Sequence, residues 1–186
     1  VTYREVPLTP EGEVDFEGVR SAIGPNTRCI GIQRSRGYAD RPSFSMASLE
    51  EMIRWLEDHV PEAVIFVDNC YGESVEDMEP TAVGADLMEG SLIKNPGGGL
   101  AKTGGDIAGK RKWVERAASR LVAPGIGMDG GATYGHLRDY FQGLFLAPHI
   151  VGQALKGAVF AAALLAEAGF STSPAWDEPR TDIIHQ

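Results

Sequence analysis

The feature that most constrains the fold is a short, continuous apolar run that ends in an acid. Residues 63–67 read AVIFV, and Asp68 follows at once. A strand that is apolar at every position is typical of a parallel sheet covered on both faces, whereas a strand with one wet face alternates apolar and polar residues. Asp68 then lies at the end of a buried strand, where its carboxylate needs a cation or a protonated nitrogen as a partner.

Segments with helix and strand patterns alternate before this run. Residues 15–23 have the apolar spacing of a helix that Asp15 caps, and residues 29–32 form a short apolar strand. The sequence SLEE, residues 48–51, is a capping box and predicts the start of a helix that Pro61 ends.

The alternation continues after Lys94. Residues 106–109 predict a short strand and residues 111–122 a helix, and residues 136–167 predict two helices that are kinked or parted at Pro148. This order predicts an α/β fold, with a mostly parallel sheet, flanking helices and active groups at the carboxyl ends of the strands.

Charge and composition narrow the classes of function. The 17 basic and 26 acidic side chains leave a net charge of −9, which argues against binding to nucleic acid or to an anionic membrane. The longest apolar stretch, residues 157–166, is too short to span a bilayer and predicts a core helix. Cys29 and Cys70 show no disulfide framework, which favours reduced thiols and a cytoplasmic location.

Two glycine motifs leave a nucleotide- or dinucleotide-binding module as an alternative. Residues 125–130 read GIGMDG and satisfy G-x-G-x-x-G, but a helix and Pro124 precede them instead of a strand. Residues 97–103 read GGGLAKT and are similar to a phosphate loop, but Ala101 stands where the motif needs glycine. Neither motif has the context that nucleotide binding requires.

Asp68 and Lys94 form a more specific pair. They are 94 − 68 = 26 residues apart, and Lys94 follows two apolar residues and precedes a glycine-rich turn. Partial desolvation would lower the pKa of this lysine and make its amine nucleophilic enough to form a Schiff base. A buried ion pair or a surface lysine remains the alternative, because perturbed pairs are often structural.

Six motifs carry a family resemblance. They are IQRSRGY (32–38), VDNCYGE (67–73), GSLIKNPGGGLA (90–101), APGIG (123–127), QGLFLAPH (142–149) and WDEPRTDII (176–184). With them the chain resembles the large domain of fold-type I, aspartate-aminotransferase-like enzymes that depend on pyridoxal 5′-phosphate. Within that class it is similar to the aluminium-resistance, methionine gamma-lyase-like branch of the cysteine and methionine metabolism group.

The resemblance implies the cofactor site. Lys94 would hold pyridoxal phosphate covalently, and Asp68 would keep the pyridine nitrogen protonated, which makes the ring an electron sink. Either Lys94 or Tyr71 would donate a proton to the departing thiol. Ser91 would contact the cofactor phosphate, although Ile93 replaces the threonine that often precedes the lysine.

The remaining cofactor contacts are expected from loops. Backbone N–H groups of Gly97 and Gly98 would approach the phosphate or a neighbouring subunit. Gln33 follows the strand at residues 29–32, so the loop at its carboxyl end could bring Gln33 to the ring hydroxyl.

Substrate binding is expected from arginines. Arg34, Arg36 and Tyr38 follow the same strand and could reach the substrate carboxylate, although an arginine-rich surface loop explains them equally well. The resemblance adds Arg180 as a bidentate clamp for that carboxylate. No metal is expected, because His136 and His149 have no ligand pattern around them.

As a whole, the resemblance implies a carbon–sulfur lyase for an amino acid such as methionine or cystathionine. It implies a homodimer or homotetramer with shared active sites. Residues 1–170 would be the central part of a large domain and residues 171–186 the start of a small one, in a longer subunit without which this segment would be inactive. A non-catalytic protein that retains the fold remains a further alternative.

Overall fold

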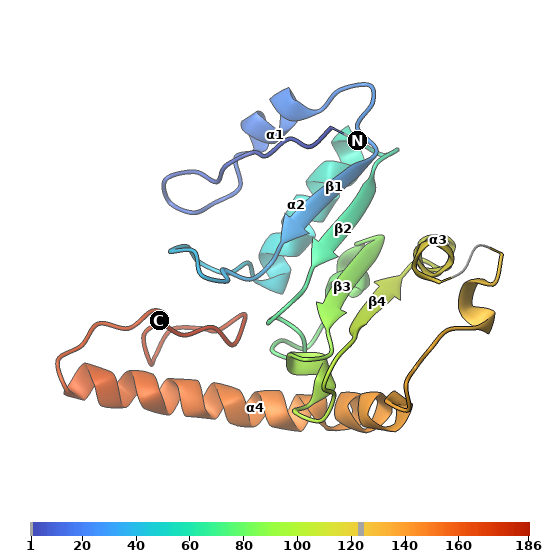
Figure 1. Ribbon diagram of the computed structural model, residues 1–186. Helices are drawn as coiled ribbons and strands as arrows, with labels where there is room; N and C mark the ends of the chain where they lie inside the picture. The colour runs from blue at the N-terminus through green and yellow to red at the C-terminus, as the bar shows by residue number, and fades with distance from the viewer. Residues whose placement is uncertain (1, 123–124) are drawn as a thin grey trace.

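The computed structural model describes residues 2–122 and 125–186 and shows an α/β arrangement around one sheet (Figure 1). Its four strands lie in the order β1-β2-β3-β4. They are β1 (Cys29–Gln33), β2 (Val64–Asp68), β3 (Leu87–Ser91) and β4 (Gly105–Gly109). β1, β2 and β3 are parallel, whereas β4 runs antiparallel to β3. The predicted α/β class is confirmed, and the sheet is mixed.

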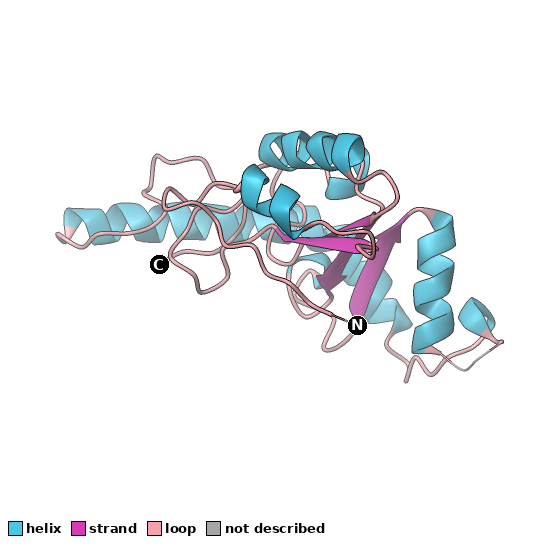
Figure 2. Ribbon diagram, turned by 90° about the horizontal axis from the view of Figure 1, so that it is seen from above, coloured by secondary structure: helices cyan, strands magenta, loops and turns pink. Residues whose placement is uncertain are grey.

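The described residues form four helices. They are α1 (Phe16–Ala22), α2 (Met46–His59), α3 (Arg111–Leu121) and α4 (Leu137–Glu167). Single 3₁₀ turns form at η1 (Pro80–Val83), η2 (Asn95–Gly97) and η3 (Gly127–Asp129). Figure 2 shows α1 and α2 on the same side of the sheet. The APGIG motif lies partly outside the described residues, because they omit 123 and 124.

The core lies between α2 and the central strands. Leu49 and Ile53 of α2 are fully buried against Ile65 and Val67 of β2. Each such side chain contributes about 1.5–3 kcal/mol through burial. Val64 and Phe66, on the other face of β2, are only half-buried. The expectation that both faces of this strand are covered is therefore not met within the described part of the chain.

The start of α2 differs from the prediction. Ser45, not Ser48, is the N-cap, and its hydroxyl accepts a hydrogen bond of 3.1 Å from the Ser48 N–H. The Glu76 carboxylate also accepts the N–H of Met46 at 3.1 Å. This long-range contact satisfies a free N–H of the first turn, so the helix extends toward its N-terminus.

α4 is one helix of 31 residues that continues through Pro148. The predicted division there is wrong, since proline removes one hydrogen bond, to the carbonyl four residues earlier, and the flanking turns keep theirs. Half of the residues in the predicted core segment 157–166 are exposed, and Ala162 is its buried residue.

By length and composition α4 could cross a membrane, since its most apolar window has a mean hydropathy of 1.5 and only 11% of that window is buried. Figure 1 shows much of α4 extending beyond the sheet.

The last residues return to the carboxyl ends of the strands. The Ser35 hydroxyl donates a 2.6 Å hydrogen bond to the Asp182 carboxylate, and the Ile183 N–H donates to the Tyr71 carbonyl at 3.1 Å. These contacts fix the C-terminal segment against the loops that follow β1 and β2, so residues distant in sequence surround one end of the sheet.

Candidate functional site

The predicted site residues gather at the carboxyl ends of the parallel strands. Gln33 ends β1 and lies opposite Asp68, the last residue of β2, in the strand register. Asp68 in turn lies opposite Glu89 of β3. Ser91 ends β3, and its carbonyl accepts the Lys94 N–H at 2.9 Å. The parallel topology therefore brings Asp68 and the Lys94 loop to the same edge, as the sequence predicts.

Tyr71 lies next to the amino group of Lys94. The Lys94 Nζ atom is 4.3 Å from the centre of the Tyr71 ring, within the range of a cation–π contact. Tyr71 has a left-handed backbone with φ of 71°. Its carbonyl accepts hydrogen bonds from the Asn95 side chain and the Ile183 N–H, both at 3.1 Å. These two contacts stabilise a conformation that non-glycine residues rarely adopt.

The pKa of Lys94 is not lowered as predicted. Partial burial favours the neutral amine, but a hydrogen bond with Cys70 and the nearby Cys70, Tyr71 and Asp68 groups outweigh burial and raise the pKa of Lys94. Burial raises the pKa of the Cys70 thiol to about 11, with Lys94 acting in the opposite direction. In this state Lys94 is a cation beside a neutral thiol, and it must lose its proton before it can act as a nucleophile.

Acidic groups cluster around Asp68. A carboxylate oxygen of Asp68, a carboxylate oxygen of Glu89 and the Cys70 sulfur all lie within 4.8 Å of one another. Burial raises the pKa of Glu89, and the Asp68 charge raises it further. The sequence analysis does not identify Glu89. Its position two residues before Ser91, in a strand that pairs with β2, is the signal that could have identified it.

Sequence reasoning also missed a buried carboxyl pair. Glu73 is 5% exposed, and neither of its carboxylate oxygens has a hydrogen-bond partner among the described residues. Burial raises the pKa of Glu73 to about 8, and Asp106 and Glu79 add to this shift. A Cβ atom on Gly90 would lie 2.4 Å from one Glu73 oxygen and 2.8 Å from one Asp106 oxygen. Gly90 therefore makes room for both acids.

Gly97 and Gly98 do not have the predicted place at a phosphate. Both are buried, and a Cβ atom on Gly98 would lie 2.3 Å from the Gly143 carbonyl oxygen of α4. A Cβ on Gly97 would lie 1.6 Å from the Leu92 carbonyl oxygen. Gly98 is therefore needed for close packing of the η2 turn against α4, and Gly97 for the tight turn that follows Leu92.

Arg34 has a structural role in place of the predicted substrate contact. Its side chain is fully buried, and its guanidinium lies 2.6 Å from the Glu76 carboxylate. It also donates to the Asn69 side chain at 2.9 Å and to the Gly72 carbonyl at 3.1 Å. With these donors engaged, Arg34 holds the loop after β2 to the end of β1.

Arg36 and Arg180 lie near each other around Asp182. Arg36 donates to the Arg41 carbonyl at 2.7 Å and to Ser173 Oγ at 2.8 Å. Burial lowers the pKa of Arg180, while Asp182 acts in the opposite direction. Two nitrogens of Arg180, Nε and one terminal nitrogen, are buried without a partner among residues 2–122 and 125–186. Arg180 therefore keeps donors that a carboxylate could accept.

Tyr38 and Gln33 have exposed side chains. Tyr38 is 96% exposed, so this chain gives it no contact with the site. Gln33 also has an exposed side chain, although it stands beside Asp68 in the register. The predicted ring-hydroxyl contact of Gln33 and the phosphate contact of Ser91 stay predictions.

The alternative nucleotide motifs do not have the required context. Residues 125–130 lie at η3, after α3, and the turn at η2 packs against α4. Neither is a strand–turn–helix junction, which both motifs need.

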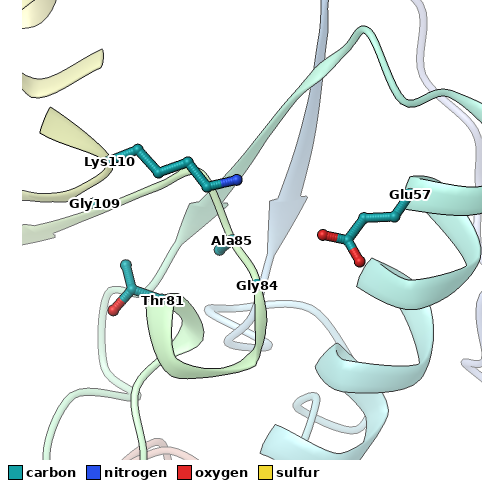
Figure 3. A pocket seen from close by; sticks show the side chains of 6 residues that line it. All are labelled: Glu57, Thr81, Gly84, Ala85, Gly109 and Lys110. Carbon is teal, nitrogen blue, oxygen red and sulfur yellow. The ribbon is translucent and has the colours of Figure 1, made fainter. Parts of the chain in front are cut away.

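The hollow in Figure 3, of about 360 Å³, lies at the opposite end of β3 and β4. It is lined by Glu57, Thr81, Gly84, Ala85, Gly109 and Lys110. Figure 3 shows Glu57 and Lys110 on either side of Gly84 and Ala85. Lys110 is already paired with Asp86 at 2.8 Å, so this hollow adds no chemistry to the site.

Known proteins share both the sequence and the fold. A family model described as methionine gamma-lyase matches residues 1–186. Protein YnbB of Bacillus subtilis (strain 168) is 55% identical over 184 residues, which are 99% of this chain and 44% of YnbB.

A Listeria monocytogenes structure, named as a candidate cystathionine beta-lyase involved in aluminum resistance, is 56% identical, with a TM-score of 0.96 over 98% of this chain and 45% of that chain. A Clostridium novyi structure, named as a carbon-sulfur lyase involved in aluminum resistance, is 41% identical, with a TM-score of 0.92 over 98% of this chain and 44% of that one.

The chain spans less than half the length of these relatives. A methionine gamma lyase from Micromonospora echinospora, 21% identical with a TM-score of 0.58 over 81% of this chain and 39% of that chain, shares the fold. Because the family model covers the chain from its first residue to its last, the chain belongs to the methionine gamma-lyase family.

Proposed function

We propose that this chain carries the central part of a fold-type I, pyridoxal-phosphate-dependent carbon–sulfur lyase that acts on a sulfur-containing amino acid. One observation carries the proposal: the carboxylate at the end of β2 and the amine of Lys94 lie at the same edge of the sheet, with the Tyr71 ring 4.3 Å from that amine. The names of the Listeria and Clostridium relatives support the same class of reaction.

The residues fit the proposed cofactor in their chemistry. An amine is needed for its aldehyde, a carboxylate for its ring nitrogen and hydroxyl or N–H donors for its phosphate. Lys94 and Asp68 supply the first two, and Ser91 supplies a hydroxyl three residues before Lys94. The packed glycines at η2 are not free to bind phosphate, so we infer that further donors come from the rest of the subunit or from a second copy. When bound, the cofactor withdraws electrons from the α-carbon of an amino acid.

Each residue at this edge then has a role. Lys94 would hold the cofactor, and its free amine would accept the proton from the α-carbon of the substrate. The negative charge of Asp68 stabilises a proton on the ring nitrogen. Tyr71 keeps the Lys94 amine in place, and its hydroxyl can return a proton to the departing thiolate. Elimination from the β-carbon or the γ-carbon uses the same groups.

Substrate recognition is assigned to Arg36 and Arg180. Two buried nitrogens of Arg180 have no partner among the described residues, and a substrate carboxylate could accept a hydrogen bond from either of them. Arg36 lies near it and is anchored through Arg41 and Ser173. Tyr38, whose side chain is exposed, is proposed as a residue that contacts the substrate only in the assembled enzyme.

The assembly is proposed on the same basis. Residues 1–170 would form the central part of the large domain, and residues 171–186 would begin the small domain. The exposed apolar side chains of α4, among them Phe141, Phe145 and Phe160, support a homo-oligomer, because such faces are usually covered in an assembly. We propose a cytoplasmic enzyme that binds neither nucleic acid nor membrane.

A product assay tests the proposal. The full-length protein is loaded with pyridoxal phosphate and given methionine, cystathionine or cysteine. Release of a thiol together with a 2-oxo acid and ammonia is expected from at least one of them. Lys94→Ala should abolish release. Wild-type protein that binds the cofactor yet releases no thiol from any sulfur amino acid would contradict the assigned reaction.

A further inference from the structure

Asp68 has a second carboxyl beside it on the neighbouring strand. Asp68 and Glu89 are paired in the register of the parallel strands β2 and β3. Side chains at paired positions of parallel strands point to the same face of the sheet. Their carboxylate oxygens, together with the Cys70 sulfur, lie within 4.8 Å of one another. Asp68 is therefore one member of a carboxyl pair.

The backbone holds both members in place. The Cys70 N–H donates to Asp68 Oδ1 at 3.1 Å, and the Asn69 N–H donates to the Glu89 carbonyl at 3.0 Å. One Asp68 oxygen is thus fixed by the loop that follows it.

The surrounding charges favour one proton on this pair. Burial raises the pKa of Glu89, and so do the charge of Asp68, the charge of Asp106 on β4 and a hydrogen bond with Asp68, whereas Lys94 lowers it. The Cys70 thiol, whose pKa is raised to about 11, adds no charge at neutral pH. Two negative charges this close repel each other, which favours a proton on Glu89.

We propose that Glu89 is a positioning residue that keeps its proton at neutral pH and donates it in a hydrogen bond to Asp68, so that Asp68 presents its charged carboxylate to the cofactor nitrogen. This inference rests on the proposed function. When Glu89 loses its proton, Asp68 loses a donor and gains a repelling neighbour. Cofactor binding then changes with pH through Glu89, a residue that does not itself touch the cofactor.

The first test needs no cofactor. Full-length protein with ¹³C-labelled carboxyl groups is titrated by NMR with a chelator present. The Glu89 signal is identified as the one that is missing from the spectrum of Glu89→Gln. We expect Glu89 to titrate above the usual range of glutamate, and Asp68→Asn to move it back down. Titration in the usual range, or no response to Asp68→Asn, would overturn the proposal. So would a titration that appears only when the chelator removes a cation from the pair.

The second test follows cofactor affinity by the visible absorption of bound pyridoxal phosphate. Glu89→Gln can still donate a hydrogen bond, so its affinity for the cofactor should stay within about threefold of wild type. Wild-type affinity should fall at alkaline pH as Glu89 loses its proton, and the affinity of Glu89→Gln should not. Glu89→Leu cannot donate, and its affinity should fall roughly tenfold, the effect of one hydrogen bond to a charged group. Glu57→Gln, at the opposite end of the sheet, is the control and should match wild type.

The two tests separate the two claims. Equal affinities of Glu89→Leu and wild type would show that Glu89 does not position Asp68. If wild-type protein fails to bind pyridoxal phosphate at all, the proposed function fails, and the carbon titration still decides whether Asp68 and Glu89 share a proton.

Discussion

The amino group of Lys94 lies 4.3 Å from the centre of the Tyr71 ring, and Tyr71 reaches that place through a left-handed backbone with φ of 71°. Such a conformation costs about 1–3 kcal/mol in a residue other than glycine. The Asn95 side chain and the Ile183 N–H both bind the Tyr71 carbonyl and hold it there. Residues from the Lys94 loop and the C-terminal segment thus keep Tyr71 beside Lys94.

The ring and the hydroxyl of Tyr71 have different proposed roles, which two variants can test separately. Tyr71→Phe keeps the ring, so cofactor affinity should change less than about threefold, while kcat should fall about 100-fold because the proton donor is lost. Tyr71→Ala should lower both. Steady-state kinetics and absorbance titration measure the two effects. A Tyr71→Phe enzyme with wild-type kcat would exclude the hydroxyl as the proton donor.

Arg34 should matter for folding more than for substrate binding. Arg34→Met leaves the Glu76 carboxylate without its buried partner, and we expect a loss of about 3–5 kcal/mol in the free energy of unfolding. Arg54→Met is the matched control, because the Arg54 side chain is 72% exposed in its pair with Glu50 and should contribute about 0.5 kcal/mol. Urea denaturation compares them. Equal effects would contradict the structural role.

The contact between η2 and α4 depends on glycine. A Cβ on Gly143 would lie 2.2 Å from the Gly97 carbonyl oxygen, so Gly143→Ala should destabilise the fold by about 1–3 kcal/mol. Gly152 lies in the same helix, with no described atom within 4 Å of an added Cβ, and Gly152→Ala should stabilise by about 0.5–1 kcal/mol. Thermal unfolding should show opposite shifts, and shifts of the same sign would contradict the packing.

Glu73 should make the protein less stable as pH rises. Burial raises the pKa of Glu73 to about 8, so the folded state keeps a proton that the unfolded chain loses above the usual range of glutamate. Below that range Glu73 is protonated in both states and does not change the free energy of unfolding. Above it, the loss in the free energy of unfolding grows until the pH passes about 8. Glu73→Gln should therefore match wild type near pH 4 and gain roughly 4–5 kcal/mol near pH 9.

The control for this titration is Glu62→Gln, which lies on the exposed surface. Chemical denaturation at several pH values gives the free energies of unfolding. A Glu73→Gln variant whose advantage is the same at pH 4 and pH 9 would show that Glu73 does not carry this dependence.

Local sequence patterns predict most elements of this chain. β1, α1 and α3 form where apolar spacing and the Asp15 cap place them, because these signals lie within one element. β3 was not predicted, since its sequence LMEGS carries a charge and a glycine where a strand pattern needs apolar residues. Its pairing with β2 and β4 overrides that weak propensity.

The site, like the fold, is predicted only in part from local sequence patterns. The sequence pairs Asp68 with Lys94 because a carboxylate at the end of a buried strand needs a cation as a partner, and the family resemblance assigns both residues to one cofactor. The burial of Arg34 and the packing of Gly98 on Gly143 depend on contacts between distant segments, which no local pattern records. The raised pKa of Lys94 likewise depends on neighbours such as Cys70, whose position the fold decides.

The central claim is that Lys94 and Asp68 hold opposite ends of one pyridoxal phosphate. Full-length protein loaded with the cofactor should absorb visible light, and borohydride should fix the cofactor to Lys94, as peptide mass spectrometry would show. Asp68→Asn should still be labelled at Lys94 but lose about 100-fold or more in activity, since the ring nitrogen loses its charged partner. A label on another lysine, or no label on wild-type protein, would contradict the account.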